Sequence, residues 1–146
     1  MKRLFCLILV LAMSVCCLAA CNFTQNIADK MESDTESAPL VSEMMDALCE
    51  GQKQAALTLM HPALTESAGA AIDQMISYLS GKQTVSSELL NINVSSSRGT
   101  SGKTLQEQLV YGIEMSNGEI IYINATYVSD KDGAGFASFQ LILGAV

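Results

Sequence analysis

Apolar residues recur with the spacing of one helix face in the region that follows residue 38. The first helix is expected to begin near Pro39, because proline suits a first helical turn, and to end at Gly51. Ser37 precedes this helix as a candidate cap. The apolar face of the helix consists of Leu40, Val41, Met44, Met45 and Leu48.

Two further helices are expected in this half of the chain. The shorter one covers residues 53–60 and ends before His61 and Pro62. The longer one begins at Thr65, a candidate cap, and ends before Gly81. Its apolar stripe consists of Ala68, Ile72, Met75, Ile76 and Leu79.

The second half of the chain changes to the two-residue period of β-strands. Leu90, Ile92 and Val94 alternate with polar residues, which predicts a half-buried strand. Residues 98–103 are rich in Gly, Ser and Thr and are expected to form a loop, and residues 130–133 a turn. The last strand is expected to point three residues at the core: Phe139, Leu141 and Leu143.

The hairpin around residues 116–118 (SNG) has a register that follows from its side chains. A two-residue turn would place Ile113 opposite Tyr122 and mix apolar with polar residues on each face. A three-residue loop separates the two kinds of residue and needs Gly118 at a positive φ. We expect the three-residue loop, because a slip of one residue moves every side chain to the other face. The core-facing pairs are then Ile113 with Ile121, Tyr111 with Ile123, and Leu109 with Ala125.

Helices followed by a four-stranded antiparallel meander predict an α+β fold, in which three N-terminal helices pack on one face of the sheet. The chain resembles the nuclear transport factor 2-like superfamily, and in particular its small exported lipoproteins. The resemblance rests on the helix that ends at Gly51, on residues 55–64 (AALTLMHPAL), on the long hairpin and on residues 133–143 (GAGFASFQLIL). It covers most of residues 39–146 and implies a curved sheet around a long helix, with a cone-like cavity. Members of the superfamily use this cavity for catalysis, ligand binding or dimerisation, so the fold does not decide the function.

The amino-terminal segment resembles the signal of bacterial lipoproteins. A basic start (MKR) and an apolar stretch precede residues 18–21 (LAAC), which are similar to a lipobox. The resemblance implies that residues 1–20 are removed and that the thiol of Cys21 is lipidated, which gives a stable membrane anchor. An ordinary secretory signal and an uncleaved membrane helix are the alternatives, but the apolar stretch is shorter than a span of about 20 residues. The expected location is the outer face of a bacterial membrane, either the cell membrane or an outer membrane.

Removal of the signal would leave a more acidic chain. Loss of two of the 8 basic residues, Lys2 and Arg3, changes the net charge from −7 to −9. A chain of this charge repels nucleic acids and anionic lipid headgroups, so nucleic acid is not an expected partner and only Cys21 holds the chain to the membrane. Residues 21–38 are polar and acidic and predict a flexible tether, which leaves residues 39–146 as a single domain.

Cysteine and histidine offer little chemistry. Cys49 has no disulfide partner in the mature chain, because the other cysteines lie in residues 1–20 or carry lipid. It is expected to act as a small buried hydrophobe, with a catalytic or intermolecular thiol as the alternative. His61, the single histidine, is expected to cap a helix end or to form a hydrogen bond there, with a general base or a metal ligand as the alternative. No spacing such as HExxH or CxxC occurs, so we expect neither a metal nor a cofactor.

Asp46, Tyr78 and Tyr111 are the candidate residues of the cavity. Tyr78 on the third helix and Tyr111 on the core face of the sheet could line it with their hydroxyl groups, and ordinary core packing is the alternative. An enzyme would pair Tyr111 with Asp46 or Glu107 for acid–base chemistry, although no spacing rule favours such a pair.

These features favour a membrane-anchored module that binds a small ligand or a surface protein without catalysis. The alternative is a small hydrolase or isomerase at the cell surface, which would need a buried carboxylate with a raised pKa. A third hypothesis is a homodimer through the outer face of the sheet, where Val110, Ile120 and Tyr122 would lie exposed among polar residues.

Overall fold

A computed structural model describes residues 35–99 and 102–144 of the chain. The expected signal, Cys21 and residues 21–34 of the expected tether lie outside these residues. The described chain is an α+β fold, as predicted: helices come first, and the strands that follow form one antiparallel sheet in the order β1-β2-β3-β4. Residues from Thr35 onward form one compact unit.

The helices occupy the first part of the described chain, and their bounds are α2 Ala38–Cys49, α3 Lys53–Thr58, the 3-10 turn η1 Pro62–Leu64 and α4 Thr65–Leu79. Pro39 lies in the first turn of α2, as expected. Gly51 follows this helix with a φ of +72°, a left-handed conformation that glycine adopts without strain. Thr65 is the first residue of α4 rather than its cap, and its hydroxyl donates to the carbonyl of His61 at 3.4 Å.

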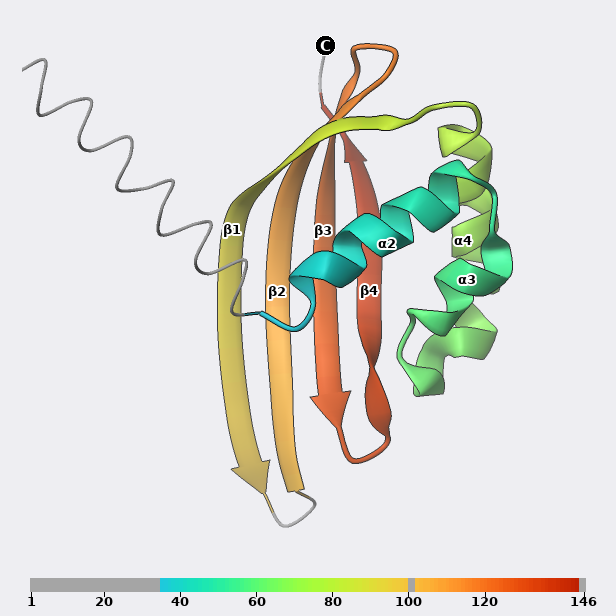
Figure 1. The fold of residues 1–146 in the computed structure, drawn as a ribbon. Coiled ribbons are helices and arrows are strands. Elements are labelled where there is room, and N and C mark those ends of the chain that lie inside the picture. The colour runs from blue at the N-terminus through green and yellow to red at the C-terminus, as the bar shows by residue number, and fades with distance from the viewer. Residues whose placement is uncertain (1–34, 100–101, 145–146) are drawn as a thin grey trace, which may run out of the picture. The chain divides into compact units, whose positions relative to one another are not determined.

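The strands are β1 Thr84–Gly99, β2 Gly102–Met115, β3 Ile120–Asp130 and β4 Gly133–Leu143. Figure 1 shows α2 crossing one face of this sheet, with α3 and α4 beside β4. The expected loop over residues 98–103 was wrong, because Arg98 pairs with Lys103 and Gly99 with Gly102. The two strands pair almost to the tip of their hairpin, so the polar composition there marks exposed strand ends.

The β2–β3 hairpin has the predicted three-residue loop. Gly118 has a φ of +80°, and its N–H donates to the carbonyl of Met115 at 2.8 Å. The N–H of Met115 donates in turn to the carbonyl of Glu119 at 2.9 Å. All the predicted core-facing pairs are present: Ile113 with Ile121, Tyr111 with Ile123, and Leu109 with Ala125. The separation of apolar and polar residues onto two faces therefore predicted the register correctly.

β1 is more exposed than its alternating pattern predicted. A bulge between Leu89 and Asn91 inserts one extra residue, so that Leu90 lies on the opposite face of the sheet from Ile92. Leu90 is 49% exposed and Val94 is 50% exposed, whereas Leu89 and Ile92 pack against the core. The prediction of one half-buried face was therefore wrong for Leu90 and Val94.

The core fills the space between the helices and the inner face of the sheet. Phe136, which the sequence pattern did not single out, is fully buried because a bulge opposite Thr126 and Tyr127 shifts the alternation of β4. Its ring meets the ring of Tyr127 edge-on at 5.8 Å and that of Phe139 at 5.3 Å. Leu143 faces inward but is 55% exposed, because it lies at the end of the strand beside an open groove. The other fully buried side chains include Met44, Met45, Leu48, Ile72, Leu79, Leu109, Ile113, Ile121 and Ile123.

The connection between α3 and η1 crosses the start of β4 with its backbone in contact. The N–H of Phe136 donates to the carbonyl of Leu59 at 2.8 Å, and the N–H of His61 donates to the carbonyl of Phe136 at 3.0 Å. Met60 thereby forms a parallel bridge with Phe136. A Cβ atom on Gly135 would lie 2.6 Å from the backbone of Met60 and His61, so this approach requires glycine.

We expect Gly135→Ala to destabilise the domain by about 2–3 kcal/mol, because the added methyl group forces the two backbones apart. Gly69→Ala is the matched control. Gly69 lies within α4, where a Cβ atom would meet nothing closer than Lys53 Nζ at 3.8 Å. This control should stabilise the domain by about 0.5–1 kcal/mol, since alanine is the better helix former. Urea unfolding measures both values, and similar effects of the two substitutions would contradict the close crossing.

Candidate functional site

The structure places the three candidate cavity residues in different surroundings. Tyr111 on β2 is 2% exposed and belongs to the core. Asp46 is exposed on α2 at the rim of a polar groove. Tyr78 lies near the end of α4, where it lines an apolar groove and takes part in a polar cluster. Asp46 and Tyr78 line two different grooves of the described residues, and the role of the three residues in binding stays a prediction.

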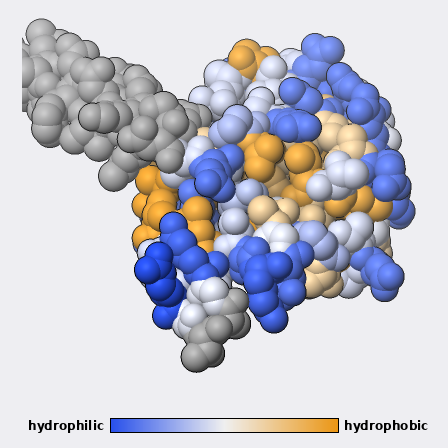
Figure 2. Space-filling model, turned by 60° about the horizontal axis from the view of Figure 1, so that its bottom comes forward, coloured by the Kyte–Doolittle hydropathy of each residue, from blue (hydrophilic) through white to orange (hydrophobic). Residues whose placement is uncertain are grey.

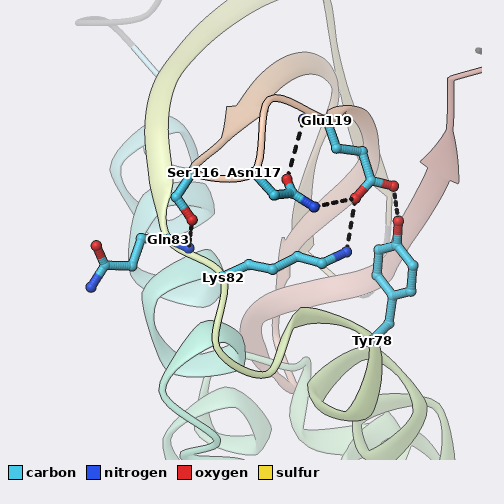
Figure 3. Close-up of polar contacts among 6 residues, drawn as sticks. All are labelled: Tyr78, Lys82, Gln83, Ser116, Asn117 and Glu119. Atoms are coloured by element: carbon cyan, nitrogen blue, oxygen red, sulfur yellow. Dashed lines mark hydrogen bonds and ion pairs between the residues drawn. The ribbon is translucent and has the colours of Figure 1, made fainter.

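The polar cluster joins the end of α4 to the β2–β3 hairpin (Figure 3). Glu119 accepts hydrogen bonds from the hydroxyl of Tyr78, from Lys82 Nζ at 2.8 Å and from Asn117 Nδ2 at 3.2 Å. Lys82 Nζ also lies 3.7 Å from the centre of the Tyr78 ring, which is a cation–π contact. One carboxylate therefore holds three donors that come from α4, from the connection after it and from the hairpin.

Hydrogen bonds within the hairpin tip and to Gln83 hold the tip that presents Glu119 in place. The side-chain oxygen of Asn117 accepts from the N–H of Glu119 at 3.2 Å, which is a local turn motif that asparagine favours. The N–H of Gln83 donates to Ser116 Oγ at 3.1 Å, and the N–H of Ser116 donates to the carbonyl of Gln83 at 2.8 Å. The bonds between Gln83 and Ser116 therefore attach the tip to the segment that follows α4, independently of the contacts that Glu119 makes.

The cluster has a definite charge state at neutral pH. Hydrogen bonds lower the pKa of Glu119 from 4.5 to about 2. The bond from Lys82 has the largest effect, followed by those from Tyr78 and Asn117. The hydrogen bond that Tyr78 donates to Glu119 raises the pKa of Tyr78. The hydrogen bond that Lys82 donates to Glu119 likewise raises the pKa of Lys82. Glu119 is therefore ionised, Tyr78 neutral and Lys82 charged. None of the three exchanges a proton near neutrality, so the cluster suits a structural role better than acid–base catalysis.

A polar groove of about 360 Å³ lies on the Lys82 side of the cluster, between α2 and the segment after α4. Cys49 in this groove is partly buried and packs against the core, in keeping with a small hydrophobe. Burial raises the pKa of its thiol most, and the charges of Asp46 and Glu50 raise it further. A raised pKa disfavours the reactive thiolate. The groove is lined by Asp46, Cys49, Glu50, Gly81, Lys82, Gln83 and Thr84.

An apolar groove of about 410 Å³ lies on the Tyr78 side, between α4 and the last part of β4. Leu143 stands half exposed in it, and no charged side chain lines it among the described residues. Its lining residues are Ala71, Gln74, Met75, Tyr78, Phe139, Gln140, Leu141, Ile142 and Leu143. Figure 2 shows from another side that apolar residues reach the surface of the domain in patches between hydrophilic ones. Exposed apolar surface of this kind is typical of binding sites when it is contiguous.

His61 has the capping role that the sequence predicted. It is 6% exposed, and its Nδ1 accepts from the N–H of Ala63 at 3.3 Å at the start of η1. Its Nε2 lies 3.4 Å from a carboxylate oxygen of Asp130 in the β3–β4 turn. The hydrogen bond from the N–H of Asp132 lowers the pKa of Asp130, and the hydrogen bond from His61 lowers it to a lesser extent. This pair secures the turn to the segment that crosses β4.

Glu107 is the one carboxylate that is buried in the described chain, at 3% exposure. Both the N–H of Ser37, at 3.1 Å, and the hydroxyl of Ser37 donate to it. Ser37 therefore does not cap α2 with its side chain, as the sequence had suggested, but attaches the start of that helix to β2. Glu107 has the same parity along β2 as Leu109 and Tyr111, so the register itself could have placed it on the inner face.

The described residues contain no group of three or more His, Cys, Asp or Glu side chains that could hold a metal ion. No helix in the described part of the chain combines the length and the apolar character needed to cross a membrane. The chain matches no protein-family model, no curated protein and no solved structure at a significant level. The candidate sites are therefore the two grooves and the polar cluster between them.

The pKa of Glu119 gives a test of the cluster. A carboxyl whose pKa falls on folding stabilises the folded state above its ordinary pKa, and this contribution is lost as the pH drops from 4.5 to about 2. We expect Lys82→Met to raise the pKa of Glu119 toward 4.5, because the hydrogen bond that lowers this pKa most is lost. Lys53→Met should leave it unchanged, since Lys53 pairs with Asp73 elsewhere at the surface.

Carbon-13 NMR titration of the Glu119 carboxyl group measures this pKa in each variant. A Glu119 that titrates near 4.5 in the wild-type chain would contradict the hydrogen bonds of Figure 3.

Proposed function

We propose that this chain is a lipid-anchored extracytoplasmic lipoprotein whose domain binds a small ligand or a surface protein, without catalysis. The similarity of residues 18–21 to a lipobox supports the anchor at Cys21 and the location at the outer face of a bacterial membrane. The observation that carries the binding role is the open apolar groove between α4 and β4, with Leu143 55% exposed in it.

The chemistry of this groove favours binding over catalysis. Met75, Leu141 and Leu143 offer apolar area, and each buried Å² of such area contributes about 25 cal/mol to binding a ligand. The hydroxyl of Tyr78 already donates to Glu119, so it is engaged by the domain itself. A ligand of this groove is therefore expected to be largely apolar, with few polar groups at the Gln74 and Gln140 rim.

We assign the fold to the nuclear transport factor 2-like type as part of the same proposal. Among the described residues, α2, α3 and α4 precede a four-stranded antiparallel meander, and this order supports the assignment. The contact between residues 55–64 and 133–143 supports it as well, because these two segments carry the sequence resemblance. In this fold the groove beside α4 would be an opening of the cone-like cavity.

A small hydrolase or isomerase is the second candidate, and buried Glu107 is the observation that favours it. Such an enzyme needs a carboxylate that takes up a proton near neutral pH. NMR titration of the carboxyl groups decides between the two candidates: a group that titrates near neutrality supports the enzyme. If every carboxyl group titrates at or below its ordinary pKa range, the result supports the binding module.

We expect Cys21→Ser to carry no acyl chains, because it lacks the thiol that the proposed anchor lipidates. Intact-mass spectrometry of the membrane fraction should show the added mass of acyl chains in the wild type and none in Cys21→Ser. Cys49→Ser is the control and should behave like the wild type. A wild-type chain without acyl chains would refute the anchor.

Site-specific photocrosslinking tests the groove in cells that carry the anchored protein. A benzoylphenylalanine in place of Gln74, an exposed residue of the groove, should form a covalent adduct whose mass identifies a ligand or a partner. The same probe in place of Lys131, exposed in the β3–β4 turn, is the control. Leu143→Glu should abolish the adduct by placing a charge in the groove. An adduct that is equal at both positions, or absent from both, would count against binding at this groove.

A further inference from the structure

One edge of β4 borders the apolar groove. β4 is the last strand in the order β1-β2-β3-β4, so within the sheet it pairs with β3 alone. The chain crosses its other edge at one point, where the backbones of Leu59 and His61 bond to Phe136. This crossing protects the start of the edge from pairing with other chains. Beyond Phe136, no backbone hydrogen bond from another part of the described chain reaches this edge.

The direction of each backbone group in β3 follows from the β2–β3 hairpin. The N–H of Met115 donates to the carbonyl of Glu119 where this hairpin closes. From there, hydrogen-bonded pairs alternate with non-hydrogen-bonded pairs along the two strands. The N–H and C=O groups of Ile121, Ile123 and Ala125 therefore face β2, and those of the residues between them face β4.

The same alternation continues into β4. Gln140 and Ile142 lie opposite residues of β3 that face β4, so their backbone groups bond to β3. The residues that turn their N–H and C=O groups to the open edge are Phe139, Leu141 and Leu143. Phe136 agrees with this assignment, because its backbone groups also bond away from β3. The bulge after Phe136 accounts for the change from even to odd residue numbers along the open edge.

A row of backbone groups with this spacing is specific for an extended polypeptide. Alternate residues of a strand lie about 7 Å apart, and each presents one N–H donor and one C=O acceptor. An extended chain presents the complementary groups with the same period, whereas a small apolar molecule does not. The open edge therefore favours a strand over other apolar ligands of the groove.

The groove beside this edge suits the side chains of such a strand. Met75 and Tyr78 of α4 are partly buried and line it opposite β4. Successive side chains of an added strand point to opposite faces of the sheet. Those on the inner face would meet Met75, Leu141 and Leu143, so we expect them to be apolar.

The charge of the chain adds a preference for the residues at either end of the strand. No charged side chain lines the groove among the described residues. The whole chain, however, has 15 acidic and 8 basic residues. Its negative field attracts basic groups and repels acidic ones. Basic residues are therefore expected on both sides of the apolar segment.

We infer that the groove binds an extended segment of a partner polypeptide, which adds a fifth strand to the open edge of β4. Its side chains are apolar at every second position, and its flanks are basic. In Figure 1, α3 and α4 lie beside β4, so two copies of the domain would bring their helices together before their strands could pair. A single extended chain avoids this contact. The inference rests on the proposed function, because it names the class of partner for the same groove.

Amide hydrogen exchange measured by NMR tests the inference, with the synthetic peptide KVTVTVK as the probe. The protein is a chain that begins at residue 22, which folds without the signal and the lipid because residues from Thr35 onward form a compact unit with its own core. In the free chain, the N–H groups of Leu141 and Leu143 should exchange fast. With about 1 mM peptide they should exchange at least about fivefold more slowly. The N–H groups of Gln140 and Ile142 are the controls and should be protected in both states.

Ala71→Phe and Ala70→Phe are a matched pair of variants. Both alanines are exposed in α4, but Ala71 lines the groove and Ala70 does not. We expect Ala71→Phe to raise the Kd of the peptide at least about tenfold, because its ring occupies the space of the added strand. Ala70→Phe should leave the Kd unchanged. Circular dichroism confirms that both variants are folded before their Kd values are compared.

Two N-methylated forms of the peptide test the backbone contact itself. Methylation of alternate residues removes the N–H groups from one edge of a strand and leaves its side chains intact. One edge of the bound peptide faces β4 and the other does not. Methylation at the valines and methylation at the threonines should therefore give Kd values that differ at least about tenfold. Equal Kd values would contradict strand addition.

The outcomes separate strand addition from the proposed function of the groove. Protection of Leu141 and Leu143 in the free chain would overturn the inference, because residues 22–34 or a second copy would then cover the edge. No binding of KVTVTVK at about 1 mM, or binding that leaves their exchange unchanged, would overturn it as well. A photocrosslinked adduct at Gln74 would in that case still support a ligand of the groove. Absence of both the adduct and the peptide complex would overturn the two proposals together.

Discussion

At the start of β4, the backbone of Met60 and His61 passes so close to Gly135 that a side chain would not fit between them. Two backbone hydrogen bonds close this crossing, and one bridge continues the sheet into the helical region. An edge strand that is covered in this way is protected from pairing with other chains. The crossing also determines where α4 begins, because η1 and α4 follow His61 directly.

The candidate sites follow from this placement of α4. Its far end meets the β2–β3 hairpin, and there Glu119 binds Tyr78 and Lys82 and closes the second attachment between helix and sheet. Between the two attachments α4 stands beside the last part of β4, and the apolar groove remains open there. Ser37 and Glu107 attach the start of α2 to the sheet in a third place. These polar side chains therefore mainly hold the helices on the sheet. Binding at the groove would then depend mainly on apolar contacts.

Local patterns predicted the parts of the fold that depend on neighbouring residues. Apolar spacing located α2 and α4, and the separation of faces predicted the pairing of Ile113 with Ile121. The pattern failed at the bulges, because one inserted residue changes the face of everything after it. Leu90 and Phe136 are the two residues misjudged or missed for this reason.

The candidate site was harder to predict, because its contacts join residues far apart in the sequence. The sequence indicates Tyr78 as a candidate, but its partner Glu119 lies 41 residues away, and no sequence pattern indicates Lys82. The position of Ser37 two residues before Pro39 predicts a cap, whereas the carboxylate that accepts from its hydroxyl comes from β2, 70 residues later. Asp46, Tyr78 and Tyr111 could not be tested for a shared cavity until the direction of each side chain was known.

The central proposal is that this chain is a lipid-anchored module that binds a largely apolar ligand or a surface protein. Native mass spectrometry of the mature protein, released from its membrane in detergent, tests the claim most directly. We expect chains that begin at residue 21 and carry at least two acyl chains each, with a retained ligand visible as added mass. Chains without acyl chains, or chains that keep residues 1–20, would contradict the proposal.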